Sequence, residues 1–321
     1  MRDACGRDIN YLRISVTDKC NLRCRYFMPE GVRLVPMENL LTMEEIAAIV
    51  RCGVRLGIDR VKLTGGEPLV RRGITSLMSL LRQVDGLQQV TMTTNGILLR
   101  QYLPELVKYG LSAVNISLDS LDRETYREIT GFDQLPEVLA AIDAALAAGL
   151  RVKINAVLLA DQNADAWQEL ILLAKDLPVD VRFIELMPIG EGAALAGMSN
   201  DDLFEQIRGR YPDIAADERI HGNGPAVYFQ IPGFKGSVGL ISAMHHKFCG
   251  GCNRVRLTAM GQLKPCLCYA DSTDLRTILR GQGEAAVCEA MEKAIYNKPQ
   301  AHCFEMKKYI TEDHLMSSIG G

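Results

Sequence analysis

Stretches typical of β-strands alternate with stretches typical of α-helices over residues 1–190, and this alternation limits the possible folds most strongly. It occurs about six times, at spacings of roughly 25 to 35 residues. Regular strand–helix alternation predicts parallel βαβ units with right-handed crossovers. Both a doubly wound sheet and a partial barrel contain such units, and six are fewer than the eight of a complete (βα)8 barrel. The alternation alone does not choose between them.

The predicted elements follow this pattern in order. Strands are predicted at residues 11–17, 60–63, 89–93, 113–118, 152–158 and 181–186. Helices are predicted at residues 42–56, 73–84, 101–109, 122–130, 135–148 and 164–176, the first of them opening with a capping box of Thr42 and Glu45. A Gly/Ala-rich segment at 190–200 ends the pattern. We therefore expect a partial barrel in residues 1–190 and a smaller C-terminal domain in 191–321, with a helix at 201–210 and strands at 226–231 and 237–241.

The composition is that of an ordinary globular protein. The chain has 321 residues, a net charge of −3 and 48% hydrophobic residues, which is ample for a core. No apolar run approaches the roughly 20 residues that a membrane span needs, and the N-terminal residues lack the apolar region of a signal peptide. We expect a cytoplasmic protein, with no electrostatic case for binding nucleic acid or membrane.

Two groups of cysteines predict metal chemistry. Cys20 and Cys24 lie on the loop that leaves the first predicted strand. Thiols in a chain without a secretory signal favour metal over disulfide, and soft thiolates favour iron–sulfur clusters or zinc. The second group is Cys249, Cys252 and Cys266.

The second group taken alone fits either zinc or a three-cysteine iron–sulfur site. Zinc would need a fourth ligand, for which Cys268, His245 and His246 are the nearby candidates. The first cysteine loop favours iron. The remaining cysteines, Cys52, Cys288 and Cys303, are predicted to be buried small hydrophobic residues.

Seven motifs carry a resemblance to a known family. They are NYLRISVTDKCNLRCRYFMPEG, LTGGEPLVRRG, TTNG, NISLDSLD, RFIELMP, FCGGCNRVRLTAMG and the terminal SSIGG. In this order and spacing they resemble the GTP 3′,8-cyclases of molybdenum-cofactor biosynthesis, which are radical S-adenosylmethionine (SAM) enzymes. The resemblance covers nearly the whole chain. It implies an α/β fold, an incomplete (βα)6 TIM-type barrel followed by a smaller iron–sulfur domain, and so favours the barrel over the open sheet.

The resemblance also implies an activity, the rearrangement of GTP to (8S)-3′,8-cyclo-7,8-dihydroguanosine 5′-triphosphate, the first step of molybdopterin biosynthesis. It implies two [4Fe–4S] clusters, SAM and an electron donor. It further implies a homodimer, and cyclic pyranopterin monophosphate synthase as the pathway partner. The alternative is a catalytically inactive GTP-binding homologue that retains only the C-terminal cluster.

Individual residues take roles from the resemblance. The implied iron ligands are Cys20, Cys24, Cys249, Cys252 and Cys266; the SAM contacts are Tyr26, Gly65, Gly66, Glu67, Thr94, Ser117, Lys153 and Met187; the substrate contacts are Arg13, Arg60, Lys62, Arg182, Arg254 and Arg256; and the tail residues Gly320 and Gly321 act in catalysis. Physical chemistry supports the cations, because a planar guanidinium suits phosphate oxygens. Arg254 and Arg256 are two apart and share a face of an extended segment.

One position departs from the family pattern. The family's cluster loop reads C-x3-C-x2-C, and Phe27 occupies the third cysteine position. Phenylalanine offers no iron ligand, so the N-terminal cluster should be labile or absent. Three explanations compete: an inactive natural or engineered variant, an error or design choice in the sequence, or substitution by another thiol. Cys5 is the only other cysteine before Cys52.

Overall fold

The computed structural model describes residues 1–28, 31, 35–312 and 315–319. Its strands, in chain order, are β1 (Tyr11–Ser15), β2 (Arg60–Thr64), β3 (Gln89–Thr94), β4 (Leu111–Ser117), β5 (Arg151–Ala156), β6 (Asp180–Ile184), β7 (Ala215–Ala216), β8 (Val227–Gln230), β9 (Val238–Ile241), β10 (Arg254–Leu257), β11 (Gln262–Lys264) and β12 (Thr273–Asp274). Its α-helices are α1 (Met43–Arg55), α2 (Ile74–Arg82), α3 (Leu99–Lys108), α4 (Arg123–Thr130), α5 (Leu135–Ala147), α6 (Trp167–Asp176), α7 (Asn200–Arg210), α8 (Leu275–Tyr296) and α9 (Met316–Ile319).

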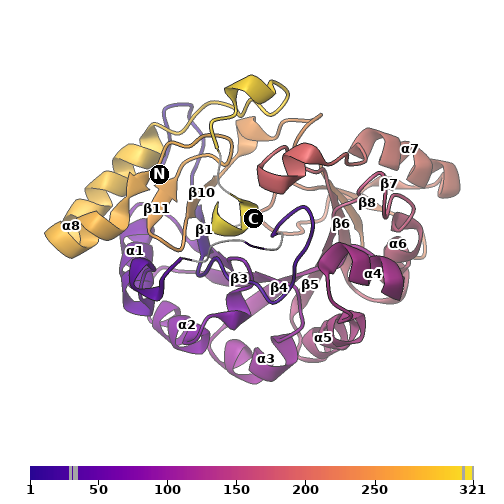
Figure 1. Ribbon diagram of the computed structural model, residues 1–321, viewed down its shortest axis with the longest axis horizontal. Helices are drawn as coiled ribbons and strands as arrows, with labels where there is room; N and C mark the ends of the chain where they lie inside the picture. The colour runs from indigo at the N-terminus through magenta and orange to yellow at the C-terminus, as the bar shows by residue number, and fades with distance from the viewer. Residues whose placement is uncertain (29–30, 32–34, 313–314, 320–321) are drawn as a thin grey trace.

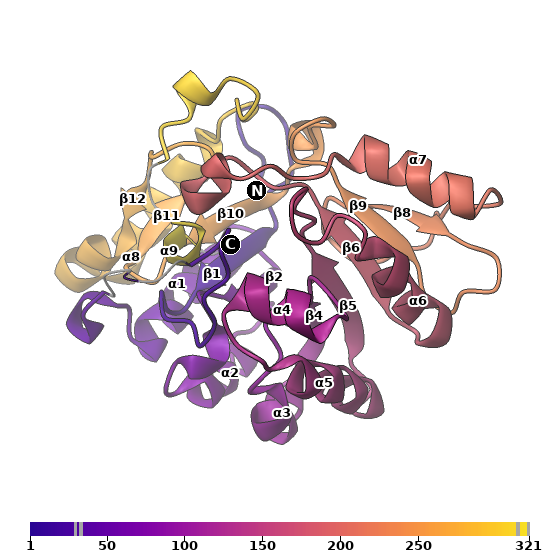
Figure 2. The ribbon, with the colours of Figure 1, turned by 45° about the vertical axis from the view of Figure 1, so that its right-hand side comes forward.

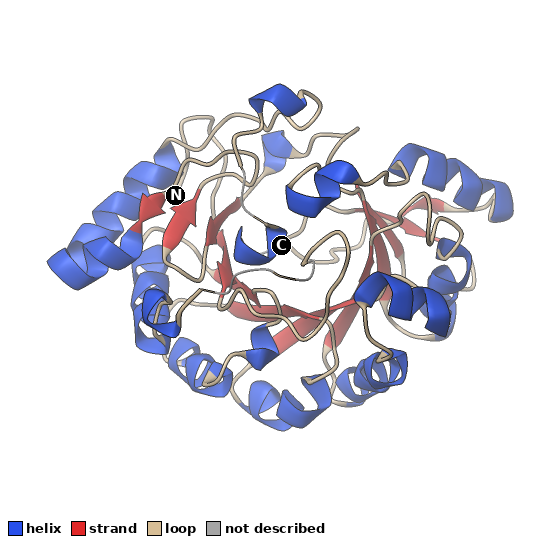
Figure 3. Cartoon of the chain, in the orientation of Figure 1, coloured by secondary structure: helices blue, strands red, loops and turns tan. Residues whose placement is uncertain are grey.

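All of these strands belong to one sheet, in the order β12-β11-β10-β1-β2-β3-β4-β5-β6-β9-β8-β7. The central strands from β10 to β9 are parallel, and the strands beyond them at both edges pair antiparallel. The sheet curves around a central space with helices on its outer side (Figures 1 and 3). The predicted incomplete (βα)6 barrel is therefore confirmed.

The C-terminal half extends this barrel on both sides. Strand β9 pairs with β6, and β10 pairs with β1. The two strands predicted in this half are present as β8 and β9, whereas β7, β10, β11, β12 and α8 were not predicted. The segment after residue 190 thus extends the wall of the barrel at both edges.

The central parallel strands, such as β2, β3 and β4, are mostly buried on both faces, as expected for parallel strands under helices. On the outward face of β1, Leu12 and Ile14 are fully buried in a cluster that includes Ile46 and Ile49 of α1. The predicted capping box starts α1: Thr42 Oγ1 accepts a hydrogen bond from the Glu45 amide at 3.1 Å, and the Glu45 carboxylate accepts one from the Thr42 amide at 2.8 Å. The opposite alternation turns Tyr11, Arg13 and Ser15 inward.

The Gly65–Gly66–Glu67 segment fixes the start of the cysteine loop. The amide of Gly66 donates to the Thr17 carbonyl at 2.8 Å, and that of Glu67 donates to the Lys19 carbonyl at 2.7 Å. A Cβ on Gly65 would lie 2.6 Å from the Thr17 oxygen, and one on Gly66 would overlap the Lys19 carbonyl. Only glycine allows this close approach of two backbones.

Within the described ranges, no helix is long and apolar enough to span a membrane.

The close approach at Gly66 predicts the effect of adding one methyl group there. Gly66→Ala should lower the free energy of unfolding by roughly 1–3 kcal/mol, because the backbone carbonyl it meets cannot move aside like a side chain. Urea denaturation measures this change. Gly209→Ala in α7 is the control, since nothing lies within 4 Å of its added Cβ; alanine favours a helix and should not destabilise it. Equal stability of both variants would show that the contact carries no strain.

Candidate active site

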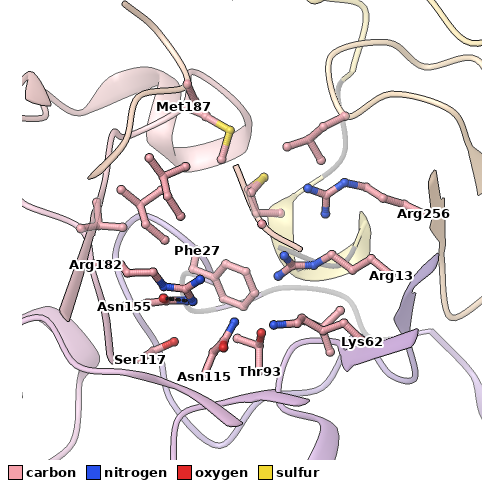
Figure 4. Close-up of a pocket in the computed structure, with 18 of the residues that line it drawn as sticks. Arg13, Phe27, Lys62, Thr93, Asn115, Ser117, Asn155, Arg182, Met187 and Arg256 are labelled. Atoms are coloured by element: carbon pink, nitrogen blue, oxygen red, sulfur yellow. Dashed lines mark hydrogen bonds between the residues drawn. The ribbon is translucent and has the colours of Figure 1, made fainter. Parts of the chain in front are cut away.

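A cavity of about 300 Å³ lies inside the curved sheet, where the carboxyl ends of the parallel strands meet. Most of the predicted site residues line it: Arg13, Cys20, Cys24, Tyr26, Lys62, Gly65, Gly66, Glu67, Thr94, Ser117, Arg182, Met187, Cys249, Cys252, Arg254, Arg256 and Cys266. They come from chain segments more than 200 residues apart. Figure 4 shows several of them facing the same space.

Two predicted residues do not line the cavity. Lys153 forms an ion pair with Asp180 at 3.3 Å and donates a hydrogen bond to Tyr228 Oη at 2.7 Å. Arg60 is the first residue of β2, at the amino end of the strand, with its Nε 3.8 Å from Asp59. Both therefore lie toward the amino ends of the strands, away from the residues at the carboxyl ends.

The tail glycines Gly320 and Gly321 lie outside the described residues. Met316, in the short helix α9 a few residues before them, lines the cavity. Helix α9 also lies within the ring of strands in two views (Figures 1 and 2).

One wall of the cavity is a row of cations. Register pairs Arg256 of β10 with Arg13 of β1, and Arg13 with Lys62 of β2. Neighbouring strands lie about 4.8 Å apart, so these like charges are held close together. Burial, followed by repulsion from the other cations, lowers the pKa of Lys62. Burial likewise lowers the pKa of Arg13 to about 10 and that of Arg256 to about 9.

Three polar residues that the sequence analysis did not single out share this wall: Thr93, Asn115 and Asn155. With its amide oxygen turned toward the cations, Asn115 accepts hydrogen bonds from Lys62 Nζ and, at 2.9 Å, from Arg182. The buried Thr93 Oγ1 has no hydrogen-bond partner within the described chain. Their inward alternation on predicted strands was the available signal, since a buried polar side chain on an inner face points to a ligand or a polar network.

The N-terminal cysteine loop lies against carboxylates. Cys20 and Cys24 both line the cavity. Burial raises the pKa of Cys20 to about 11, and burial together with the nearby Asp119 raises that of Cys24. Tyr26 Oη donates a 2.7 Å hydrogen bond to Asp119. Phe27, at the third ligand position, turns its ring into the cavity (Figure 4).

The C-terminal thiols lie in a more cationic setting. Cys249, Cys252 and Cys266 all line the cavity. Burial opposes ionisation of Cys252, but the charges of Lys298 and Arg254 outweigh it and lower its pKa. The buried Arg7 donates to the Cys249 carbonyl at 2.9 Å and so fixes that loop.

The candidate fourth ligands for zinc are engaged elsewhere. Cys268 Sγ lies 3.4 Å from Cys303 Sγ. His245 contacts Glu185 at 2.8 Å, and His246 contacts Asp201 at 2.8 Å. Across the part of the chain that the structure describes, no group of three or more cysteine, histidine or acidic side chains converges on a single metal ion. A cluster does not need such convergence, because each cysteine binds a different iron.

The donor sets therefore differ in how they fit a [4Fe–4S] cluster. Three thiols face the cavity at the C-terminal group, which fits a cluster with one open iron. Two thiols and a phenyl ring face it at the N-terminal loop, which does not fit the three-cysteine pattern.

Comparison with known proteins identifies the class. The model of the radical SAM superfamily matches residues 14–174, and that named Molybdenum Cofactor Synthesis C matches residues 179–304. The fold is similar to that of Streptococcus suis SuiB, crystallised with S-adenosylmethionine, at a TM-score of 0.64, 14% identity, 96% coverage of this chain and 76% of that one. The match to the family model over residues 14–174 places the chain in the radical SAM superfamily.

The relatives narrow the class to one family. The chain is 43% identical to the GTP 3′,8-cyclase of Clostridium perfringens (strain 13 / Type A) and 45% identical to that of Alkaliphilus oremlandii (strain OhILAs). Each alignment covers 100% of both chains. The chain belongs to the GTP 3′,8-cyclase family.

The C-terminal thiol group gives a direct test of the iron assignment. Cys252→Ala should leave the barrel folded, because the thiol does not belong to the main apolar core, but should lower the iron bound after anaerobic reconstitution by about four per chain. Iron analysis and circular dichroism measure the two effects. Cys288→Ala on α8 is the control, since Cys288 does not line the cavity. Unchanged iron in Cys252→Ala would contradict the assignment.

Proposed function

We propose that the cavity binds GTP and that this chain carries out the GTP 3′,8-cyclase reaction, the first step of molybdenum-cofactor biosynthesis, whenever its N-terminal centre is complete. The row Arg256–Arg13–Lys62 carries the proposal. Buried like charges repel one another and are stabilised by an anion placed between them. A triphosphate is such an anion, and whole-length relatives are GTP 3′,8-cyclases.

The cations hold the triphosphate, and their positions orient the rest of the nucleotide. Arg254 and Arg256 lie on β10, which begins two residues after Cys252. A nucleotide held by these arginines therefore lies beside the C-terminal thiols. An iron–sulfur cluster on Cys249, Cys252 and Cys266 would supply an open iron as a Lewis acid. Asn115 fixes Lys62 and Arg182 by hydrogen bonds, which keeps the cations in place before the ligand arrives.

The proposed SAM contacts lie toward the carboxyl ends of the strands. They are Glu67, Thr94, Ser117 and Met187, together with Tyr26, Gly65 and Gly66, and all of them line the cavity. Glu67 accepts hydrogen bonds from Thr94 Oγ1 at 2.8 Å and from the Asn95 amide at 2.7 Å, which joins the ends of β2 and β3. The proposal keeps Gly320 and Gly321 as catalytic tail residues, supported by Met316 in the cavity.

The alternative function is a GTP-binding homologue without catalysis, and Phe27 is the observation that favours it. Iron and sulfide per chain after reconstitution separate the two functions, at about eight irons for two clusters and about four for one.

The family supports further proposals on assembly, location and partners. The protein is a homodimer in the cytoplasm, receives electrons from a donor, and passes its product to cyclic pyranopterin monophosphate synthase.

The cation row predicts how GTP binding responds to mutation. Arg256→Ala should weaken GTP binding by about tenfold or more, because charge-assisted hydrogen bonds contribute roughly 1.5–3 kcal/mol each. The loss should shrink as salt rises, since salt screens the remaining cations. Isothermal titration calorimetry at two salt concentrations measures both effects.

Arg60→Ala is the matched control. It removes the same charge from β2, but from a residue that does not line the cavity, so the affinity should change far less. An unchanged affinity in Arg256→Ala at low salt, or an equal loss in both variants, would count against the site.

A further inference from the structure

Phe27 takes the place of an iron ligand in a loop that is otherwise in order. The amide of Phe27 donates to the Cys24 carbonyl at 3.0 Å, so the residue follows Cys24 in a tight turn. Its ring projects into the cavity and lies between Arg182 and Arg13 in the view of Figure 4. A thiol at this position would face the same space as Cys20 and Cys24.

No other described thiol is placed to complete this set. Cys5 is exposed and does not line the cavity. The preceding residue is held on the outside of the barrel, since the Ala4 amide donates a hydrogen bond to the Tyr296 carbonyl of α8 at 2.9 Å. Cys52 and Cys288 lie on the outer helices α1 and α8. Cys268 and Cys303 contact each other. The three remaining thiols form the C-terminal group.

The carboxylates beside the loop are already engaged. Asp119 accepts hydrogen bonds from Tyr26 Oη at 2.7 Å and from the Val157 amide at 2.9 Å, one on each oxygen. Both oxygens of Glu67 likewise accept hydrogen bonds, from Thr94, Asn95 and the Leu69 amide. Ligation of iron by either residue would break bonds that hold the strand ends together.

Tyr126 offers a buried oxygen near the cysteine loop. Tyr126 lines the cavity, and its Oη has no hydrogen-bond partner among the described residues. A phenol oxygen is a hard ligand, whereas iron–sulfur clusters are held by soft thiolates. Tyr126 is therefore a poor match for the missing thiolate, and the experiment tests whether it nevertheless replaces it.

We infer that the cysteine loop of this chain holds no SAM-cleaving cluster, that the C-terminal thiols hold its cluster, and that the single change Phe27→Cys installs the missing one. This inference rests on the proposed function for the identity of the site. The backbone bonds from Gly66 and Glu67 to Thr17 and Lys19 fix the loop without any contribution from Phe27. Cysteine is smaller than phenylalanine and needs no rearrangement to enter.

The experiment compares the unaltered chain with Phe27→Cys and Phe27→Ala, all reconstituted anaerobically with iron and sulfide. Phe27→Ala is the matched control, because it removes the ring without adding a thiolate. Expected iron per chain is about four, eight and four, respectively. Formation of 5′-deoxyadenosine from SAM, with dithionite as electron donor, should be at least about a hundredfold faster in Phe27→Cys. Loss of a residue that only supports a metal ligand already lowers activity by about 10–100-fold, and here a ligand itself is gained.

Two results would overturn the inference: about eight irons in the unaltered chain, or SAM cleavage by it at a rate close to that of Phe27→Cys. In either case Tyr126→Phe and Cys5→Ser identify the replacement ligand by loss of the iron. Equal iron in Phe27→Ala and Phe27→Cys would also overturn it: about eight in both would show that removal of the ring is enough, and about four in both that the added thiolate installs no cluster. GTP titration of the unaltered chain separates this outcome from failure of the proposed function, which predicts binding whatever the N-terminal loop holds.

Discussion

The burial of like charges along one row of the sheet is the constraint on which the architecture depends. Arg256, Arg13 and Lys62 are aligned by strand register, and each pays a desolvation cost that a protein tolerates only where a ligand or polar network compensates. The row exists only because β10, from the C-terminal half, pairs with β1. The two halves of the chain therefore cannot be assigned separate functions, since each supplies cations to the same wall.

Much of the barrel could be predicted because its signals are local. Each strand–helix unit has its own periodicity, and the capping box at Thr42 marks a helix start without reference to any other segment. The insertion of β10 beside β1 could not be predicted in this way, because four residues of a short strand do not encode a partner some 240 positions away. Helix α8 was not predicted for a different reason, because the non-helical Gly283 interrupts its helical pattern.

Site residues could be predicted where the type of side chain alone indicates its chemistry, and were missed where only their position in the fold does. Cysteine and arginine side chains indicate their chemistry by type, so the sequence singled out the thiols and cations that line the cavity. Asn115 and Thr93 became significant only once the structure showed them beside Lys62 and Arg182. Lys153 and Arg60 show the converse: a cation on a predicted strand can point inward and still be paired with Asp180 or lie near Asp59, away from the cavity.

The two cysteine groups also differ in how their surroundings prepare them for iron. Burial opposes ionisation of Cys252, but Lys298 and Arg254 outweigh it and lower its pKa, whereas burial raises the pKa of Cys249 in the same group. Burial raises the pKa of Cys20, and Asp119 adds to the effect of burial on Cys24. A phenyl ring at position 27 leaves intact the backbone hydrogen bonds to Thr17 and Lys19 that hold the loop, yet it supplies no iron ligand. Folding and assembly of the N-terminal cluster are thus separable in this chain, since one side chain at position 27 decides the second and the backbone hydrogen bonds decide the first.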